Sequence, residues 1–229
     1  MTIAFDAVTT NNFTGDLTLP HTPAGTPRGV LFLCAQNTAS DQIATVTYGA
    51  VSMAEVTGSP VIGSAGDEPM IVYGYFLGAG IPAGVQDLVV DTTGTAAKSG
   101  VVVTMTAAAD TEVDATAIQD AVEDDPTLQL NTTASTNTFV MAVLASGSNG
   151  LTDVTPDAAY TQLFESSQSG LRVMNHMRRT TNPTGGAVTV NWTTAAAEDA
   201  YILAVAIREA GGGGAVVLDP FGMTGFFGS

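Results

Sequence analysis

Two histidines, one cysteine and a cluster of carboxylates are the side chains of this 229-residue chain that are best suited to catalysis or metal binding. Ser–His–Asp hydrolysis needs a histidine base beside a positioned serine, and the sequence has no Gly-X-Ser-X-Gly nucleophile elbow. His21 lies between Pro20 and Thr22, and His176 lies in an alternating segment, so neither position requires a catalytic role. One cysteine and two histidines are too few for a structural zinc site. The sequence therefore predicts a non-enzymatic protein without a cofactor, with a hydrolase as a lesser alternative.

The carboxylates gather between residues 110 and 125, where the chain has seven acidic side chains. Asp110, Glu112 and Asp114 stand at alternate positions, and Ca²⁺ binds clustered carboxylate and carbonyl oxygens. The EF-hand pattern is missing, because no glycine occupies its turn position. We interpret the run as a solvated acidic loop in which residues 116–122 form a short helix or an extended crossover. Calcium binding is the alternative.

Cys34 lies in the apolar run 29–34, which predicts a small buried side chain rather than a reactive thiol. A single cysteine also excludes a disulfide within the chain. Five aromatic side chains could form a platform that stacks on sugar rings: Tyr73, Tyr75, Phe76, Trp192 and Tyr201. We interpret them as core and sheet-face residues, because one tryptophan gives little support for such a platform.

The charge balance restricts the possible partners. Six Lys and Arg residues stand against 22 Asp and Glu residues, which gives a formal net charge of −16. Binding to nucleic acid or to an anionic membrane needs a basic patch, and Arg178-Arg179 is the only basic pair. No apolar run approaches the roughly 20 residues that span a bilayer, and residues 1–6 lack the features of a secretory signal. We expect synthesis in a cytoplasm, with no nucleic-acid or membrane partner.

The elements that position these side chains read as short strands. Continuous apolar runs at 29–34, 70–77 and 138–145 are typical of strands buried on both faces. Segments 44–48 and 171–178 alternate between apolar and polar residues instead. About ten such strands, spaced by roughly 8–12 residues and with almost no helical periodicity, predict a single antiparallel β-sandwich or jelly roll. We assign residues 1–210 to this domain.

Four glycines at 211–214 follow the last predicted strand, 200–210, and act as a flexible tether. Seven apolar side chains after them are the residues that we expect to bind a partner: Val216, Val217, Leu218, Phe221, Met223, Phe226 and Phe227. Disordered tails are normally depleted in such residues, and burying each large one is worth about 1.5–3 kcal/mol. Residues 211–229 are therefore predicted to be a glycine hinge and an apolar arm that docks on its own domain or on a partner.

The strand types of segments 46–53, 70–77, 188–193 and 200–210, in that order, resemble those of phage-associated β-sandwich proteins. The resemblance covers about residues 45–210 and implies a virion component such as a head decoration protein, a head fibre, or a tail or baseplate attachment. It carries over no catalytic residue. Low charge, abundant Thr, Ala and Gly, and the apolar arm agree with a subunit that is made in a host cytoplasm and mounted on a particle.

We therefore predict a structural component of a tailed-phage virion that decorates or cements the capsid exterior through its C-terminal arm. Its partners would be the major capsid protein or neighbouring subunits. A homo-oligomer is expected, and a trimer by analogy with the three-fold positions of capsid lattices and fibres. The alternative is a glycan- or receptor-binding module of a tail fibre or a cell-surface assembly.

Overall fold

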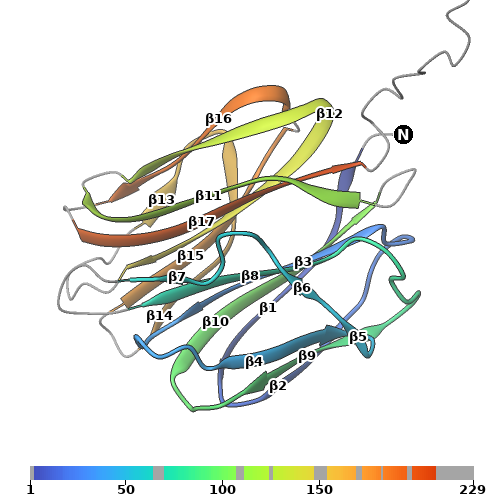
Figure 1. Ribbon diagram of the computed structural model, residues 1–229, viewed down its shortest axis with the longest axis horizontal. Helices are drawn as coiled ribbons and strands as arrows, with labels where there is room; N and C mark the ends of the chain where they lie inside the picture. The colour runs from blue at the N-terminus through green and yellow to red at the C-terminus, as the bar shows by residue number, and fades with distance from the viewer. Residues whose placement is uncertain are drawn as a thin grey trace, which may run out of the picture.

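The computed structural model describes residues 3–63, 70–106, 111–123, 126–146, 154–168, 172–181, 183–194 and 198–209. Within these ranges every regular element is a β-strand, and every strand pairing is antiparallel (Figure 1). The predicted all-β, sandwich-like fold is confirmed. The described residues contain no helix with the length and apolar character needed to span a bilayer.

The first half of the chain supplies ten strands. They are β1 (Ala4–Thr14), β2 (Leu17–His21), β3 (Gly29–Gln36), β4 (Ile43–Tyr48), β5 (Val51–Ser52), β6 (Ala54–Glu55), β7 (Val61–Ile62), β8 (Ile71–Leu77), β9 (Gln86–Thr92) and β10 (Ala97–Thr106). One group forms the central sheet, with the order β1-β10-β3-β8-β6 and with β7 also paired to β8. The remaining strands form the small sheet, with the order β2-β9-β4-β5.

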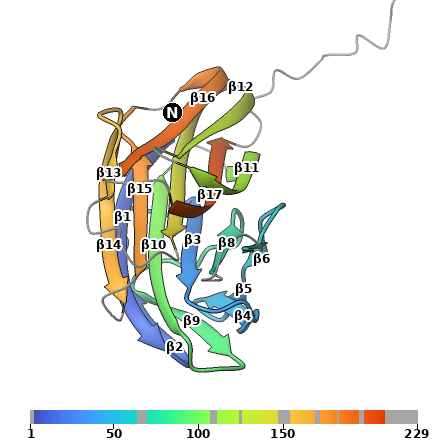
Figure 2. The ribbon, with the colours of Figure 1, turned by 90° about the vertical axis from the view of Figure 1, so that its left-hand side faces the viewer.

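The second half supplies seven strands. They are β11 (Thr111–Glu123), β12 (Thr127–Ser146), β13 (Val154–Pro156), β14 (Tyr160–Gln168), β15 (Arg172–Arg179), β16 (Thr184–Thr194) and β17 (Glu198–Glu209). The C-terminal sheet has the order β11-β17-β12-β15-β14. The first part of β12 pairs instead with β16, which also pairs with β13. Because β12 takes part in both pairings, it runs from an outer layer into the C-terminal sheet (Figure 2).

The strands therefore stack as four layers: the small sheet, the central sheet, the C-terminal sheet, and an outer layer of β13, β16 and the first part of β12 (Figure 1). An apolar core lies between each neighbouring pair of layers. Alternation along β3 explains how one strand serves two cores. Leu31 and Leu33 point into the central core, between the central and C-terminal sheets, whereas Phe32 and Cys34 point into the core under the small sheet. All eight residues of β3 are buried, as its continuous apolar run predicts.

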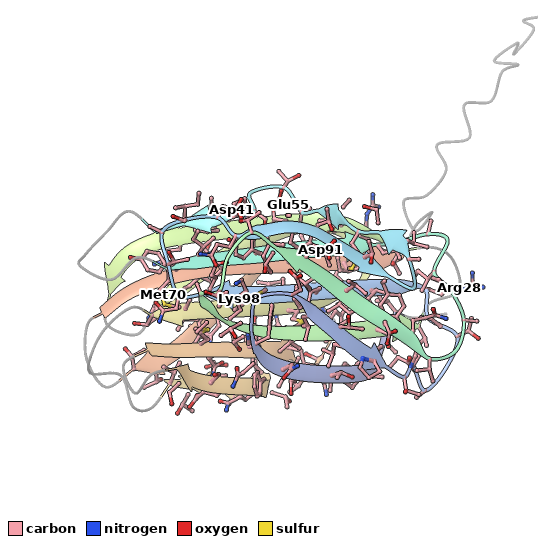
Figure 3. The ribbon with its side chains drawn as sticks, turned by 90° about the horizontal axis from the view of Figure 1, so that it is seen from below. Arg28, Asp41, Glu55, Met70, Asp91 and Lys98 are labelled. Carbon is pink, nitrogen blue, oxygen red and sulfur yellow. The ribbon has the colours of Figure 1, made fainter. Side chains whose placement is uncertain are left out.

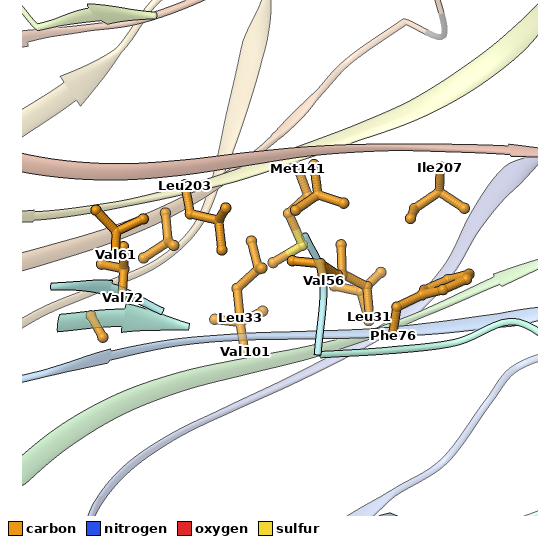
Figure 4. Close-up of a cluster of buried hydrophobic side chains, with 14 of the residues drawn as sticks. Leu31, Leu33, Val56, Val61, Val72, Phe76, Val101, Met141, Leu203 and Ile207 are labelled. Carbon is orange, nitrogen blue, oxygen red and sulfur yellow. The ribbon is translucent and has the colours of Figure 1, made fainter. Parts of the chain in front are cut away.

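The same alternation explains the apolar strands of the C-terminal sheet. Met141 on β12 and Leu203 on β17 enter the central core, opposite Leu33 (Figure 4). Their neighbours Ala142 and Ala204 face the outer core, which β16 covers with Trp192. The central core is thus built jointly by the two halves of the chain.

The acidic run 110–125 departs from its prediction. Residues 111–123 form the edge strand β11, so the interpretation as a solvated loop is wrong, and residues 116–122 are extended and not helical. The physical reason is non-local, because β11 pairs with β17 along its whole length. Val113 packs against the central core, and Ala115 and Ala117 pack against the outer core. Asp110, Asp124 and Asp125 lie outside the described residues, as do the hinge and arm predicted for 211–229.

Replacing Leu33 by Ala should lower the free energy of unfolding by about 2–5 kcal/mol, because the cavity would lie between two packed sheets. Denaturant unfolding followed by Trp192 fluorescence measures the change. Val85→Ala is the matched control, since Val85 is 61% exposed and should tolerate the substitution within about 0.5 kcal/mol. Equal effects of the two substitutions would contradict the layered core.

Candidate functional site

Both histidines of the chain hydrogen-bond to the same strand, β10, and they do so from opposite faces. His21, at the end of β2, has its Nε2 3.1 Å from the Thr104 hydroxyl. His176, on β15, has its Nε2 3.2 Å from the Ser99 hydroxyl. Ser99 and Thr104 point to opposite faces because side chains alternate along a strand. Strand β10 is therefore linked through one fully buried imidazole to the small sheet and through another to the C-terminal sheet.

The His21 link belongs to a chain of polar groups that joins β1, β2 and β10. The Thr104 hydroxyl donates to Asp6 Oδ2 at 3.0 Å, so its oxygen is left to accept a hydrogen bond from His21 Nε2–H. The other ring nitrogen, Nδ1, then accepts from the Thr9 hydroxyl at 2.8 Å. The backbone N–H of Ala24 donates to the same Asp6 oxygen at 3.2 Å. This network fixes the tautomer of the ring and satisfies both of its nitrogens.

A hydroxyl that donates to a histidine resembles a nucleophile and its base. Burial lowers the pKa of His21, and the nearby Asp6 carboxylate partly opposes that shift. Thr9, however, lies in the middle of β1, paired opposite Val102 of β10. An acyl-transfer site would also need hydrogen-bond donors placed around an oxyanion. We interpret the network as a structural link between layers.

His176 sits in a far less polar setting. Its Nδ1 has no hydrogen-bond partner among the residues that the structure describes. The ring stacks with Phe164 of β14 at a centroid distance of 6.4 Å. Burial lowers the pKa of His176 to about 3, although its hydrogen bond with Ser99 opposes the shift. The imidazole is therefore neutral at physiological pH.

Lys98, the only lysine, is buried rather than available to a partner. Its Nζ donates to Gln42 Oε1 at 3.3 Å, to the Gly94 carbonyl at 3.4 Å and to the Ala96 carbonyl at 3.0 Å. Burial lowers the pKa of Lys98, and Cys34 and Asp16 oppose the shift. Arg28, by contrast, is exposed and projects at the rim of the molecule (Figure 3). The lysine thus stabilises the turn between β9 and β10 through hydrogen bonds to its carbonyls, and it does not form a basic surface.

The five aromatic residues considered for sugar stacking are buried, with exposures of 8% or less. Trp192 Nε1–H donates to Asn175 Oδ1 at 3.0 Å, which satisfies the indole inside the outer core. The Tyr73 hydroxyl donates to Asp41 Oδ1 at 3.0 Å. Their interpretation as core residues is confirmed, and these side chains offer no exposed platform. Cys34 is likewise buried and free, as predicted.

The calcium alternative gains no support from the part of the acidic run that is described. Asp114 lies 3.5 Å from Arg208 Nε in a salt bridge across β11 and β17. Within the described ranges, no three His, Cys, Asp or Glu side chains come together as metal ligands do. Asp110 lies outside those ranges.

A small cavity of about 230 Å³ lies at the loop between β8 and β9, below the roughly 300–1,000 Å³ typical of ligand sites. Its lining consists of Thr26, Pro27, Arg28, Ala79, Gly80 and Ile81. Arg28 is the only charged residue of this lining, so the cavity has few groups that could orient a ligand. We do not assign a function to it.

The predicted partner-binding residues lie outside the described residues, namely Val216, Val217, Leu218, Phe221, Met223, Phe226 and Phe227. The structure gives the two histidines partners that sequence reasoning did not find: Asp6, Thr9 and Thr104 around His21, and Ser99 beside His176 on the opposite face of β10. The available signal was the presence of Ser99 and Thr104 on either side of the apolar run Val101–Val103, in a strand that is buried on both faces. Comparison with protein families, curated proteins and solved structures finds no match for this chain.

Replacing Lys98 by Met should lower the free energy of unfolding by about 1–3 kcal/mol, because the Gly94 and Ala96 carbonyls would lose their buried donor. Thermal and denaturant unfolding measure the change. Arg28→Met alters the net charge equally at an exposed position and should have a smaller effect. If the two variants lose the same stability, the loss would reflect net charge and not the buried contacts.

Cys34 should be inert in the folded protein, because burial both blocks access and raises the pKa of its thiol. At pH 8 we expect negligible reaction with a disulfide reagent such as DTNB, and reaction of one thiol per chain after unfolding in guanidinium. The denatured sample serves as the control for reagent activity. Rapid stoichiometric labelling of the native protein would refute the buried position.

Proposed function

We propose that this chain is a non-enzymatic structural subunit of a tailed-phage virion, which decorates or cements the capsid exterior through its C-terminal arm. The observation that carries the proposal is the composition of residues 211–229. Four glycines are followed by an apolar segment whose aromatic end includes Phe226 and Phe227. Burial of such side chains against a neighbour would provide the attachment energy, at about 1.5–3 kcal/mol for each large residue.

The strand that precedes the arm supports this role. Strand β17 pairs with β11 on one side and with β12 on the other, and both of its faces enter apolar cores. Its last residue, Glu209, pairs with Thr111 at the start of β11. An arm that continues from β17 would transmit any pull to the interior of the fold and not to a loosely held edge. Such anchorage suits a protein that holds a particle together.

The remaining features agree with a permanently assembled subunit. The only lysine is buried, both histidines are buried, and charged residues make up 12% of the chain. A surface with so few charges suits lasting contact with other proteins. The partners would be the major capsid protein or neighbouring copies of this chain, and a trimer is proposed by analogy with the symmetry of capsid lattices.

Truncation after residue 210 tests the proposal. The shortened chain should fold with the thermal stability of the full chain, because β17 and the three cores are retained. It should fail to co-sediment with particles isolated from the native source, whereas the full chain should co-sediment with them.

The double variant Phe226→Ser and Phe227→Ser keeps the chain length and is the matched control for arm chemistry. We expect it to lose most of the particle binding. Normal incorporation of the truncated protein would overturn the role of the arm. Absence of the full chain from particles, together with specific binding on a glycan array, would favour the receptor-binding alternative.

A further inference from the structure

The two histidine links of β10 differ in their ability to accept a proton. A protonated imidazole donates from both ring nitrogens, and so it needs two acceptors. Around His21 both are present, because the hydroxyl oxygens of Thr9 and Thr104 already contact its two nitrogens. The Asp6 carboxylate on β1 is bonded to Thr104 and would stabilise a positive charge.

The other neighbours of His21 leave this arrangement intact. On β4 the Tyr48 ring meets the imidazole edge-on at 6.0 Å, and burial raises the pKa of Tyr48 to about 12, so it stays neutral. On β9, Gln86 pairs opposite His21 and is uncharged. The link between β2 and β10 can therefore take up a proton while keeping its hydrogen bonds.

His176 has no such provision. Ser99 on β10 contacts Nε2, and Nδ1 lacks a partner among the described residues. Its cross-strand neighbours are apolar, with Val143 on β12 and Phe164 on β14.

The charged groups near His176 do not compensate. Glu165 on β14 bonds to Asn175, which faces the opposite side of β15. Arg178 lies on the same face of β15 as His176 and places its guanidinium 4.4 Å from the Phe5 ring centroid. Its positive charge would oppose a second one on the imidazole.

We propose that the contact between β15 and β10 is an acid-sensitive joint, which opens when His176 is protonated, whereas the contact between β2 and β10 stays closed. Opening would separate the C-terminal sheet from the central sheet at one side of the central core. It would expose Phe164 and the residues behind it to solvent. Loss of structure at low pH would thus begin at the contact between β15 and β10 and not uniformly across the layers.

The direction of the pH effect follows from the buried ring. The pKa of His176 is about 3 in the closed structure, against its ordinary value of 6.5 when exposed to water. The open or unfolded form therefore binds a proton in this interval, while the closed form does not. The stability contributed by the neutral ring is complete above about pH 6.5 and is lost as the pH falls toward 3. At pH 4.5 the closed form should be disfavoured by about a hundredfold relative to neutral pH.

Denaturant unfolding at pH 7.5 and pH 4.5 tests the joint, with the wild-type chain compared with His176→Gln. Gln cannot titrate, so the variant should lose most of the hundredfold pH effect. His21→Gln should keep most of it, because His21 has acceptors for both nitrogens and the Asp6 carboxylate opposes the lowering of its pKa. Ser99→Ala is the matched control, since it removes the hydroxyl that bonds to His176 but leaves the imidazole. This variant should be less stable than the wild type at both pH values, and the difference in stability between the two pH values should be retained. Titration of the 22 acidic residues is common to all four proteins and cancels in the comparison.

An NMR titration of the wild-type imidazoles provides a test that does not depend on any variant folding. The His176 ring signals should stay at their neutral positions from pH 7.5 to pH 5 for as long as the folded signals persist. Titration of His176 in the folded protein with a midpoint near 6.5 would overturn the proposal. A pH effect that persists unchanged in His176→Gln would also overturn it.

Discussion

Burial of single strands on both faces is the constraint on which the rest of this structure depends. Strands β3, β12 and β17 carry apolar side chains at consecutive positions, so each one needs a sheet above it and another below it. If only the central and C-terminal sheets were present, each would leave one apolar face in water. The small sheet covers one side of the stack and β16 covers the other, which yields four layers and three cores. Burial of apolar surface is worth about 25 cal/mol for each Å², so the flanking layers also stabilise the fold.

The same layering determines which hydrogen-bond partners are available to the polar side chains buried between the sheets. A buried polar group without a partner costs roughly 1–3 kcal/mol, so the bonds that a side chain makes across layers determine the cost of placing it within the stack. Lys98 finds three oxygens around one turn, and His21 finds two hydroxyls backed by a carboxylate. Among the described residues, His176 finds one hydroxyl only. The links that His21 and His176 make to β10 therefore differ in the number of hydrogen bonds that each imidazole forms.

The sequence predicts what local patterns determine and fails where partners are distant. The apolar run that contains Cys34 indicates a doubly buried strand, and β3 is one. The acidic composition of residues 111–123 suggested a loop, but pairing with β17 about 90 residues away made it a strand. The contacts from Ser99 to His176 and from His21 to Thr104 span 77 and 83 residues. No spacing rule relates such positions, because sheet order places them together.

Within the C-terminal sheet, the strand that would carry the arm and the strand that would respond to acid are different. Strand β17, from which the arm would continue, is enclosed by β11 and β12, whereas β15 lies on the far side of β12 and meets β10 through His176. A pull on the arm would load β17 and its cores, and acid would act on β15. Because β12 pairs with both strands, opening at β15 need not break the pairing that holds β17. If both proposals hold, acid could loosen this sheet from the central one while the arm stays attached to its own strand.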